Sequence, residues 1–505
     1  MKKVQYLMKK FRGRLTDKEW YHQRFDGSPM FIFAIAEAET KKEVRKPEGT
    51  EADIRVCFFG NGKADWYLEM SDVKRGAKKI VDMAKKDPNI SKKLLSAWKK
   101  DEKIFESYFL KEFPKINFKK LADHDLANAF LDAYYLFENR VTSSSIIDHY
   151  ALGTDEFIAN KLRQELKKSG QLKTSYKESQ FTEIFSIATA PIHQSFINKD
   201  EIDLLKIILG KSKETLEDYQ KRWYWSKNNY VTAQILDAGH FKKEIDTWKK
   251  SGKNLTRELK RIQATPGLNK QKKQRLFKKI KLSLHLKTLI KISEDFTWWQ
   301  DERKRATYFN IDIGCKFLSE IGRRAGYTLD ELKYAYPSEI KDVLFNKNPS
   351  RKELQKRFKG SGMIAVEGAF QIVMGEKIRE LKKLVLGKKS HNDIRDFRGL
   401  SASTGKAVGP VKVVKSSTEI GKVKPGDILV AVMTRPDYIP AMKKAAAIVT
   451  NEGGITSHAA IISREFGIPC IIGTKIATEV LKDGEMVEVN ANHGWVRKLN
   501  ISKKK

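Results

Sequence analysis

A single histidine in a glycine-bearing loop is the feature of this sequence best suited to chemistry. The stretch Asn451 to Ala460 reads NEGGITSHAA. His458 stands where a short apolar run, Ala446 to Thr450, gives way to a helical pattern that ends before Gly467. Because the helix dipole disfavours a positive charge at a helix start, we expect the imidazole to stay largely neutral. Only a neutral nitrogen can attack phosphorus, so the motif predicts a nucleophile that accepts a phosphoryl group.

Four neighbours of His458 are expected to hold that phosphoryl group. Gly453 and Gly454 permit backbone conformations with positive φ and leave room for a bulky anion, which the free N–H groups of the helix start would face. Thr456 and Ser457 offer hydroxyls that can orient the ring or bind phosphoryl oxygens. The same residues also allow a purely structural interpretation, in which Thr456 or Ser457 caps the helix and His458 is an ordinary first-turn residue.

A family resemblance favours the phosphoryl interpretation. Residues Gly426 to Thr474 resemble the mobile phosphohistidine domain of phosphoenolpyruvate synthase, pyruvate phosphate dikinase and rifampin phosphotransferase. Leu400 to Lys415 resembles the entry strand of that domain, and Asp483 to Trp495 its closing hairpin. In this family the histidine of a Gly-Gly-x-Thr-Ser-His-like motif takes a phosphate from an ATP-bound site and carries it elsewhere. His458 occupies that position, while Ser463 stands where the family usually has alanine.

A weaker resemblance covers Phe296 to Leu344, which is similar to the end of the helical, acceptor-binding region that precedes the phosphohistidine domain in rifampin phosphotransferase. This resemblance identifies no acceptor-binding residue. The charged positions within it can bind a ligand or form an exposed helix face with local ion pairs. They are Glu302, Arg303, Arg305, Arg323 and Arg324. Two aromatic groups, Trp223 to Trp225 and Trp298 to Trp299, can line a pocket or form the packed interior of a helical bundle.

Three parts are predicted along the chain. Residues 1–90 are expected to form a small α/β region, in which the apolar runs Pro29 to Ala38 and Ile54 to Gly60 are strands. Residues 91–390 show apolar spacings of three and four, which predict a helical domain, and the resemblance to rifampin phosphotransferase implies that this domain binds the acceptor. Residues 391–500 form the mobile domain. The predicted fold class is α+β, a mostly helical N-terminal and middle region followed by a C-terminal swivelling β/α phosphohistidine domain.

Two segments are expected to connect these parts. Gly360 to Gly375 contains three glycines and breaks the helical pattern, which predicts a strand and turn leading into the last domain. His391 to Arg398 is polar and charged, and it is the best candidate for a linker that lets the last domain swing.

Charge and composition narrow the function classes. The chain carries 98 Lys and Arg residues against 63 Asp and Glu, a net charge of +35, which raises the possibility of nucleic-acid binding. The lysines are spread over the whole sequence without a nucleic-acid motif, so solvated helix faces explain them better, although a basic surface can attract a phosphorylated substrate or an acidic partner. No stretch approaches the apolar length of a membrane span, and we expect a cytoplasmic protein. The remaining histidines stand singly, and no metal site is predicted.

The resemblance also implies a partner. Complete enzymes of the family need an ATP-grasp module, yet nothing before residue 390 resembles its motifs, and no glycine-rich phosphate loop is present. The mobile domain is expected to end near Leu499, which leaves no room for a barrel after it. The predicted function is a phosphotransferase component that carries a phosphoryl group on His458. The donor site, with ATP and Mg²⁺, is expected on a separate ATP-grasp protein, and the acceptor is an unknown small-molecule or phosphorylated compound.

Two alternatives stay open on the sequence. A non-catalytic phosphocarrier or regulator would be switched by phosphorylation of His458 and would release no small-molecule product. A basic nucleic-acid-associated protein would bind RNA or DNA in a salt-sensitive manner and would not need His458.

Phosphorylation of His458 is directly testable. When a competent donor is supplied, His458 should carry a phosphoryl adduct that is acid-labile and base-stable. We expect His458→Ala to abolish the adduct, because the remaining histidines lack the motif. Intact-mass spectrometry measures the labelling, and equal labelling of this variant would remove His458 from the mechanism.

Overall fold

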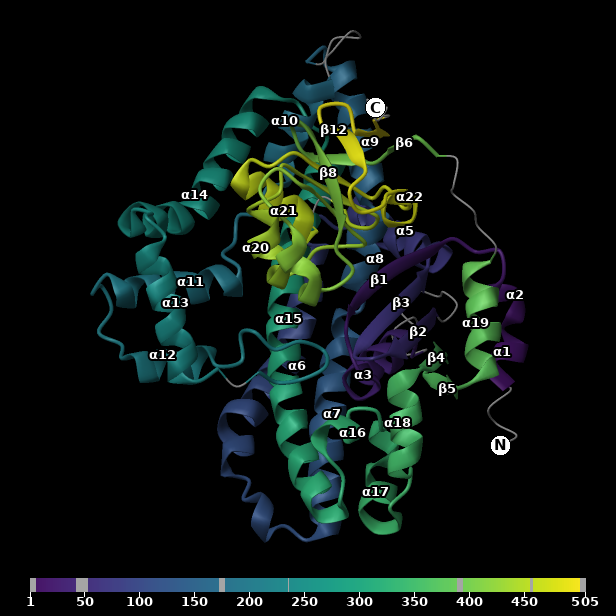
Figure 1. Cartoon of the computed structure of the whole chain (residues 1–505). Helices are drawn as coiled ribbons and strands as arrows, with labels where there is room; N and C mark the ends of the chain where they lie inside the picture. Colours follow the sequence, from purple (N-terminus) through teal and green to yellow (C-terminus); the bar gives the residue numbers. More distant parts are fainter. Residues whose placement is uncertain are drawn as a thin grey trace, which may run out of the picture.

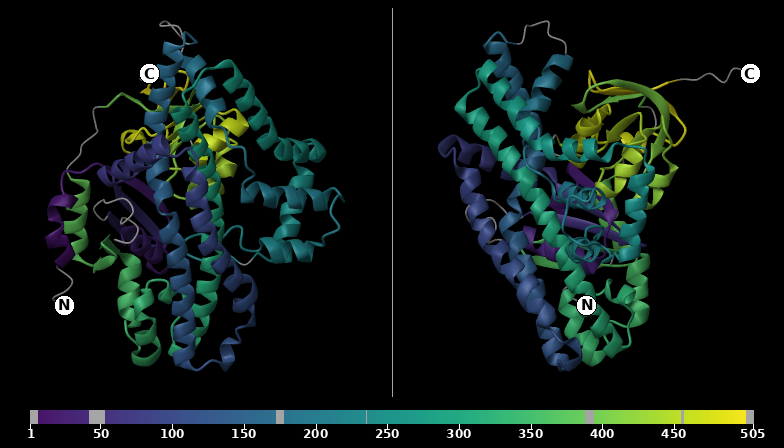
Figure 2. Two further views of the ribbon diagram at one scale, coloured as in Figure 1. Left: turned by 180° about the vertical axis from the view of Figure 1, so that it is seen from behind. Right: turned by 90° about the vertical axis from the view of Figure 1, so that its left-hand side faces the viewer.

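The structure is a computed structural model that describes residues 6–41, 53–171, 178–234, 236–387, 394–454 and 457–499. A body of long helices surrounds an N-terminal sheet, and a C-terminal β/α domain packs against one end of this body (Figure 1). Figure 2 shows the same arrangement from behind and from the side, with the C-terminal sheet lying beside the upper helices. The fold is therefore α+β, as the sequence predicts.

The first sheet has five antiparallel strands in the order β1-β3-β2-β4-β5. They are β1 (Trp20–Asp26), β2 (Ile54–Gly60), β3 (Lys63–Glu69), β4 (Ser361–Val366) and β5 (Ala369–Val373). Ile54 is paired with Val366, so the sheet joins segments about 300 residues apart. The strands and turn predicted at Gly360 to Gly375 are present, but they complete the N-terminal sheet instead of leading into the last domain. The domain boundaries at residues 90 and 390 therefore stay predictions from the sequence.

One predicted strand is wrong. Pro29–Thr40 forms a helix, α3, which is buried along nearly all of its length. A helix buried on every side shows no apolar periodicity, so its composition resembles that of a buried strand. Pro29 stands at the first helical position, where its fixed φ suits a helix start and its missing N–H costs nothing.

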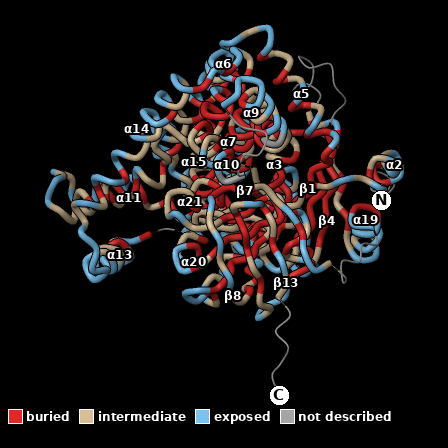
Figure 3. The backbone as a smooth tube through the Cα atoms, turned by 90° about the horizontal axis from the view of Figure 1, so that it is seen from above, coloured by how far each residue is buried: buried red, intermediate tan, exposed pale blue. Residues whose placement is uncertain are grey.

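The helical body is built around α15, a helix of 42 residues that runs through the molecule. Its last residues are followed by Gly326, whose φ of 84° ends the helix in a left-handed turn. The helices of the body, besides α3, are α1 (Tyr6–Lys10), α2 (Arg12–Leu15), α5 (Met70–Lys86), α6 (Ile90–Ser107), α7 (Asp123–Ser144), α8 (Ile146–Gly153), α9 (Asp155–Lys168), α10 (Glu178–Thr189), α11 (Phe196–Ile208), α12 (Leu216–Trp223), α13 (Ala238–Lys250), α14 (Leu255–Lys279), α15 (Leu284–Ala325), α16 (Leu329–Leu332), α17 (Ile340–Asn346), α18 (Arg351–Lys359) and α19 (Glu376–Leu386). In Figure 3 the strands and the central helices are buried, whereas much of α13 and α14 is exposed.

The C-terminal domain contains an eight-stranded sheet in the order β6-β13-β12-β8-β9-β10-β11-β7. The strands are β6 (Asp396–Arg398), β7 (Leu400–Ser403), β8 (Lys406–Val413), β9 (Ile428–Ala431), β10 (Ala447–Thr450), β11 (Cys470–Ile472), β12 (Met486–Asn490) and β13 (Trp495–Lys498). The middle strands β8 to β11 run parallel to their neighbours in this group. Helices α20 (Ile439–Met442) and α21 (His458–Phe466) cover one face, and α22 (Ala477–Val480) packs beside β9 and β10.

The predicted linker is only partly open to comparison. Residues 391–393 lie outside the described residues, while Asp396–Arg398 forms β6 at the edge of the C-terminal sheet. Phe397 is buried and the residues on either side of it are exposed, which is the alternation of an edge strand. The linker prediction is therefore wrong for Asp396 to Arg398. These residues form a three-residue strand, which its two charged residues made resemble a linker.

Polar contacts tie the C-terminal domain to the first sheet. The backbone N–H of His22 donates to Glu452 Oε1 over 3.3 Å, and the Ser417 hydroxyl donates to Asp26 Oδ2 over 2.7 Å. Among the helices of the described ranges, none has the length and apolar character needed to cross a membrane.

A glycine in the C-terminal sheet provides a test of its packing. A Cβ at Gly409, on β8, would lie 2.3 Å from the carbonyl oxygen of Gly426, and backbone cannot retreat as a side chain can. Gly409→Ala should lower the free energy of unfolding by about 1–3 kcal/mol, the range for overpacked sites. Gly421→Ala is the matched control, because nothing lies within 4 Å of its Cβ. Denaturant titration measures both, and equal stability of the two variants would contradict this packing.

Candidate functional site

His458 is the first residue of α21, directly after the loop that follows β10. Ser457 is the N-cap, and its Oγ accepts a hydrogen bond from the Ala460 N–H. The buried, β-branched residues of β10 explain the strand, and Gly467 at φ 66° ends the helix one turn after the apolar pattern stops. The strand, loop and helix predicted around His458 are present.

Thr434 orients the imidazole ring. The His458 Nδ1 lies 2.9 Å from the Thr434 Oγ1, and the Thr434 side chain is buried in the loop after β9. The His458 Nε2 is buried and has no hydrogen-bond partner among the described residues, which omit 455 and 456. When Nδ1–H donates to Thr434, the lone pair of Nε2 is free, which is the tautomer that a nucleophile requires.

Two cations keep the ring neutral. Burial lowers the pKa of His458 well below its usual value, and the positive charges of Lys304 and Arg435 lower it further. Burial and the neighbouring Arg435 also lower the pKa of Lys304, to about 8. The helix dipole acts in the same direction. The neutrality that the sequence predicts thus has an additional cause, which is the charge brought by residues distant in sequence.

Neither cation forms an ion pair within the part of the chain that the structure describes. Lys304 Nζ lies 5.7 Å from the centroid of the Tyr308 ring, and the charges of Asp437 and Asp301 only partly offset the lowering of its pKa. The Arg435 guanidinium lies over the rings of Phe25 and Tyr230, and its Nε is buried without a partner. A neutral nucleophile between two unpaired cations matches the charge of a phosphoryl group, which is negative before and after transfer.

Three of the four residues predicted to hold phosphate lie in the described part of the chain, close to His458. Gly453 has φ 119°, which favours glycine, and a Cβ there would lie 2.9 Å from Ser457 Oγ. Gly454 and Ser457 face the same cavity as the His458 ring. Thr456 lies outside the described residues. The roles of these four residues in binding phosphate therefore stay predictions, and Ser457 has a structural role as the helix cap.

Two cavities meet at His458. The sheet-side cavity, of about 270 Å³, lies between β1, β3, α3, α8, α15 and the loops of the C-terminal domain. Its wall includes Tyr21, Gln23, Glu39, Trp66, Asp148, Arg303, Arg435, Gly453, Gly454 and Ser457. The helix-side cavity, of about 260 Å³, lies between α11, α14, α15, α20 and α21. Its wall includes Ile197, Glu201, Trp298, Asp301, Ile461 and Glu465. Gln300 and Lys304 border both cavities.

Most charges in the sheet-side cavity are already paired. Arg303 forms two hydrogen bonds with Asp148, at 2.8 and 2.9 Å. Glu39 accepts from the Arg55 Nε over 2.7 Å. These pairs offset the charges of the cavity wall opposite His458. Lys304 and Arg435, at the His458 end of the cavity, form no such ion pair.

The other charged positions of the weaker resemblance form ion pairs. Arg305 pairs with Glu302, and both Arg323 and Arg324 pair with Glu320 on the same helix. Only Arg303 of the five borders the sheet-side cavity. Both interpretations of the aromatic groups apply to some of their members. Trp225 and Trp299 are core residues, whereas Trp298 borders the helix-side cavity.

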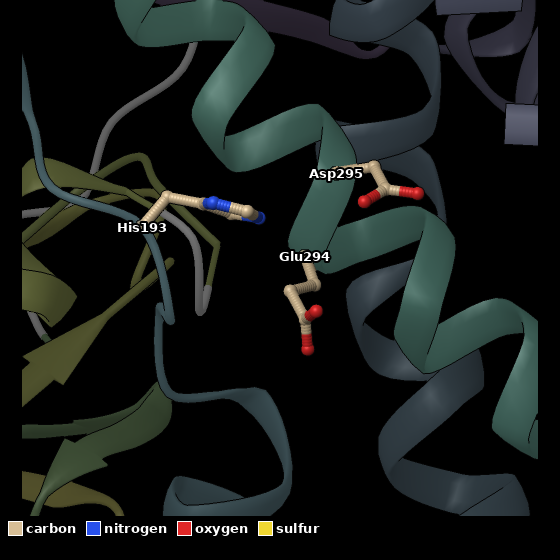
Figure 4. A group of neighbouring side chains, drawn as sticks. All are labelled: His193, Glu294 and Asp295. Atoms are coloured by element: carbon tan, nitrogen blue, oxygen red, sulfur yellow. The ribbon is translucent and has the colours of Figure 1, made fainter. Parts of the chain in front are cut away.

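Three side chains come together at metal-ligand distances, which the sequence did not indicate. Ligand atoms of His193, Glu294 and Asp295 lie within 4.8 Å of one another. Figure 4 shows the His193 ring facing α15, where the two carboxylates leave the helix in different directions. All four carboxylate oxygens have partners, namely Lys273, Lys291 and Ser91. Carboxylates neutralised by two lysines do not suit a divalent cation, so we assign no metal here.

The fold and the site together define a β/α domain in which a helix-start histidine faces a cavity beside two cations, Lys304 and Arg435. Residues 423–494 match the family model of the PEP-utilising enzyme mobile domain.

Several known proteins are similar to part of this chain. The chain is 59% identical over 108 residues to a probable phosphoenolpyruvate synthase of Archaeoglobus fulgidus, which covers 21% of this chain and 14% of the relative. It is 49% identical over 136 residues to the phosphoenolpyruvate synthase of Pyrococcus furiosus, covering 26% and 16%. An uncharacterized phosphotransferase of Bacillus subtilis is 28% identical over 290 residues, covering 55% of this chain and 34% of the relative. The matched regions therefore span about a third or less of these relatives.

The ionisation of His458 provides a test of the site. With its pKa lowered, the ring should stay neutral as the pH falls from 8 through 6, and it should become protonated only in more acidic solution. NMR titration of protein with ¹³C-labelled histidine rings measures this, with the His458→Ala spectrum as the assignment. Lys304→Gln should raise the pKa of His458, because it removes one of the two positive charges.

The matched control is Lys287→Gln, which removes an exposed lysine of α15 that borders neither cavity. This variant should leave the His458 titration unchanged. A His458 that titrates at the usual histidine pKa in the unsubstituted protein would contradict the electrostatics described above.

Proposed function

We propose that this chain is the acceptor-side part of a phosphotransferase, in which His458 carries a phosphoryl group to a hydroxyl compound bound in the sheet-side cavity. The observation that supports this most is the unpartnered Nε2 of a neutral His458, held by Thr434 between the unpaired cations Lys304 and Arg435. A histidine that only completes the core would have a partner for Nε2 and would not need free cations beside it.

The transfer proceeds in two displacements at phosphorus. First, the lone pair of Nε2 attacks the donor phosphoryl group, a P–N bond forms, and the bond to the donor oxygen breaks. Second, the acceptor hydroxyl attacks, a P–O bond forms, the P–N bond breaks, and the hydroxyl proton passes to solvent or to a nearby base. Lys304 and Arg435 offset the negative charge of the phosphoryl oxygens in the transition state of delivery, which takes place while the domain is docked.

The sheet-side cavity is the better acceptor site of the two. Gly453, Gly454 and Ser457 border it, so a phosphoryl group resting on this loop would point into it. The acceptor oxygen must then approach from the side opposite Nε2, deeper between β1 and α15. Gln23 and Tyr21 there can hydrogen-bond a hydroxyl, and Trp66 offers a flat apolar surface.

Charge pairing in this cavity points to an uncharged acceptor. The arginines on the far wall are neutralised by Asp148 and Glu39, and the two free cations are needed for the phosphoryl group itself. A carboxylate or phosphate on the acceptor would be buried without a free positive partner, which costs several kcal/mol. We therefore place neutral hydroxyl compounds ahead of keto acids and of phosphorylated compounds as acceptors.

The donor site belongs to another protein in this proposal. The sequence holds no phosphate loop, so a separate ATP-grasp protein supplies ATP and Mg²⁺, and the C-terminal domain must leave the body to reach it. Polar contacts such as Ser417 with Asp26 hold the domain against the sheet, and such contacts separate more readily than a large apolar interface. A pure regulator switched by phosphorylation would not need an acceptor cavity at His458.

Delivery to the acceptor is tested with protein charged by phosphoramidate. The charged chain is mixed with a library of neutral hydroxyl compounds, and product phosphate esters are detected by mass spectrometry. Lys304→Gln should slow delivery about 10- to 100-fold, since a charge-assisted hydrogen bond is worth about 1.5–3 kcal/mol. Lys287→Gln should deliver at the unsubstituted rate. Delivery at that rate by Lys304→Gln, or transfer only to keto acids, would contradict the proposal.

A further inference from the structure

Arg435 belongs to the C-terminal domain, and it follows directly after the residue that orients His458. We infer that Arg435 is the domain's own phosphoryl-binding residue, which accompanies His458 between the donor and acceptor sites. This inference rests on the proposed function and adds to it a division of labour between the two cations.

The backbone fixes Arg435 close to the imidazole. Thr434 is buried, with only 2% of its surface exposed, and it is joined to His458 Nδ1. Pro436 begins a short 3-10 turn, Pro436–Tyr438, and the Tyr438 N–H donates to the Arg435 carbonyl over 2.8 Å. Arg435 therefore stands between two anchored residues, and its position relative to His458 does not depend on the body.

The Arg435 side chain lacks a polar partner in the structure. Its Nε is buried and has no hydrogen-bond partner within the described ranges. The guanidinium rests on aromatic rings of the body instead, 4.4 Å from the centroid of Phe25 and 5.3 Å from that of Tyr230. A guanidinium that rests on an aromatic ring by its face keeps the N–H donors at its edge free, so these donors remain available to an anion.

The aromatic contact is weaker than the one that a phosphoryl group would offer. A guanidinium over a ring gains less than its charge-assisted, bidentate hydrogen bonds to phosphoryl oxygens. When His458 is phosphorylated, the guanidinium is therefore expected to turn from Phe25 and Tyr230 toward the phosphoryl group. The rings of Phe25 and Tyr230 hold the Arg435 side chain in place while His458 is not phosphorylated.

The two cations differ in which part of the molecule carries them. Lys304 is on α15 and stays with the body, so it can act only while the C-terminal domain is docked. Arg435 moves with His458 and can offset the phosphoryl charge at the donor site and during transit. Arg435 is thus expected to affect both half-reactions, whereas Lys304 affects delivery.

The test uses the full chain and phosphoramidate, which charges His458 without the donor protein. Charging means the adduct at position 458, and its rate is followed by mass spectrometry of the peptide that contains this position for the unsubstituted protein, Arg435→Gln, Arg435→Lys and His458→Ala. Arg435→Gln should charge about 10- to 100-fold more slowly, and Arg435→Lys should recover part of that loss because it restores the charge without the planar fork. His458→Ala should not charge at all.

A matched control separates this role from a general charge effect. Arg497→Gln removes an exposed arginine of β13 in the same domain, where it touches neither cavity. It should charge at the unsubstituted rate. Salt gives a second measurement, because added salt should slow charging of the unsubstituted protein by screening the attraction between Arg435 and the anionic donor. This salt dependence should be flatter in Arg435→Gln, which a purely structural role of Arg435 would not produce.

The outcomes distinguish this inference from the proposed function. If the unsubstituted protein is not charged, the proposed function is wrong, and the role of Arg435 is wrong with it. If it is charged, but Arg435→Gln charges equally fast with the same salt dependence, only the role of Arg435 is overturned. Should Arg435→Gln fail to fold by circular dichroism, the decision passes to Arg435→Lys, for which a rate equal to that of the unsubstituted protein overturns the inference.

Discussion

The site depends on keeping one imidazole uncharged inside an interface between two domains. His458 is half-buried where the C-terminal domain meets α15, and burial with Lys304 and Arg435 lowers its pKa. The contribution of Lys304 exists only while the domains are together, because Lys304 belongs to the body. The docked arrangement therefore sets the state of the nucleophile, and the same contacts that hold the domain in place also prepare it for reaction.

Docking of the C-terminal domain buries acidic side chains, and burial of their charges costs free energy. Burial raises the pKa of Glu452 to about 7, with Lys475 partly offsetting the effect, and burial raises the pKa of Glu465 and of Asp301 to about 7. A carboxylate that is buried in this way prefers its protonated form, so charge on it works against docking. An interface with such groups favours a contact that can be broken and remade over a permanent one.

Sequence reasoning identified the proposed nucleophile but not the residues that act on it. His458, its glycine loop and the helix after it were predicted because they are consecutive, and a strand, loop and helix leave a local pattern. Thr434, Arg435 and Lys304 were missed because their relation to His458 is set by tertiary structure. Lys304 in particular is one lysine in a lysine-rich chain, and no spacing distinguishes it from the others. The same reason explains α3, whose complete burial removed the periodicity that identifies a helix.

The pairing of β2 with β4 has a consequence for the order in which the protein can be built. The first sheet needs Ile54 and Val366 side by side, so β2 leaves the ribosome about 300 residues before its partner. Until then its hydrogen-bonding edge has no neighbour, and the chain must be kept from pairing with other strands. The C-terminal domain, whose strands all lie between residues 396 and 498, is synthesised after the body and can fold once it emerges. His458 is thus added to a body that has only just been closed by its own late strands.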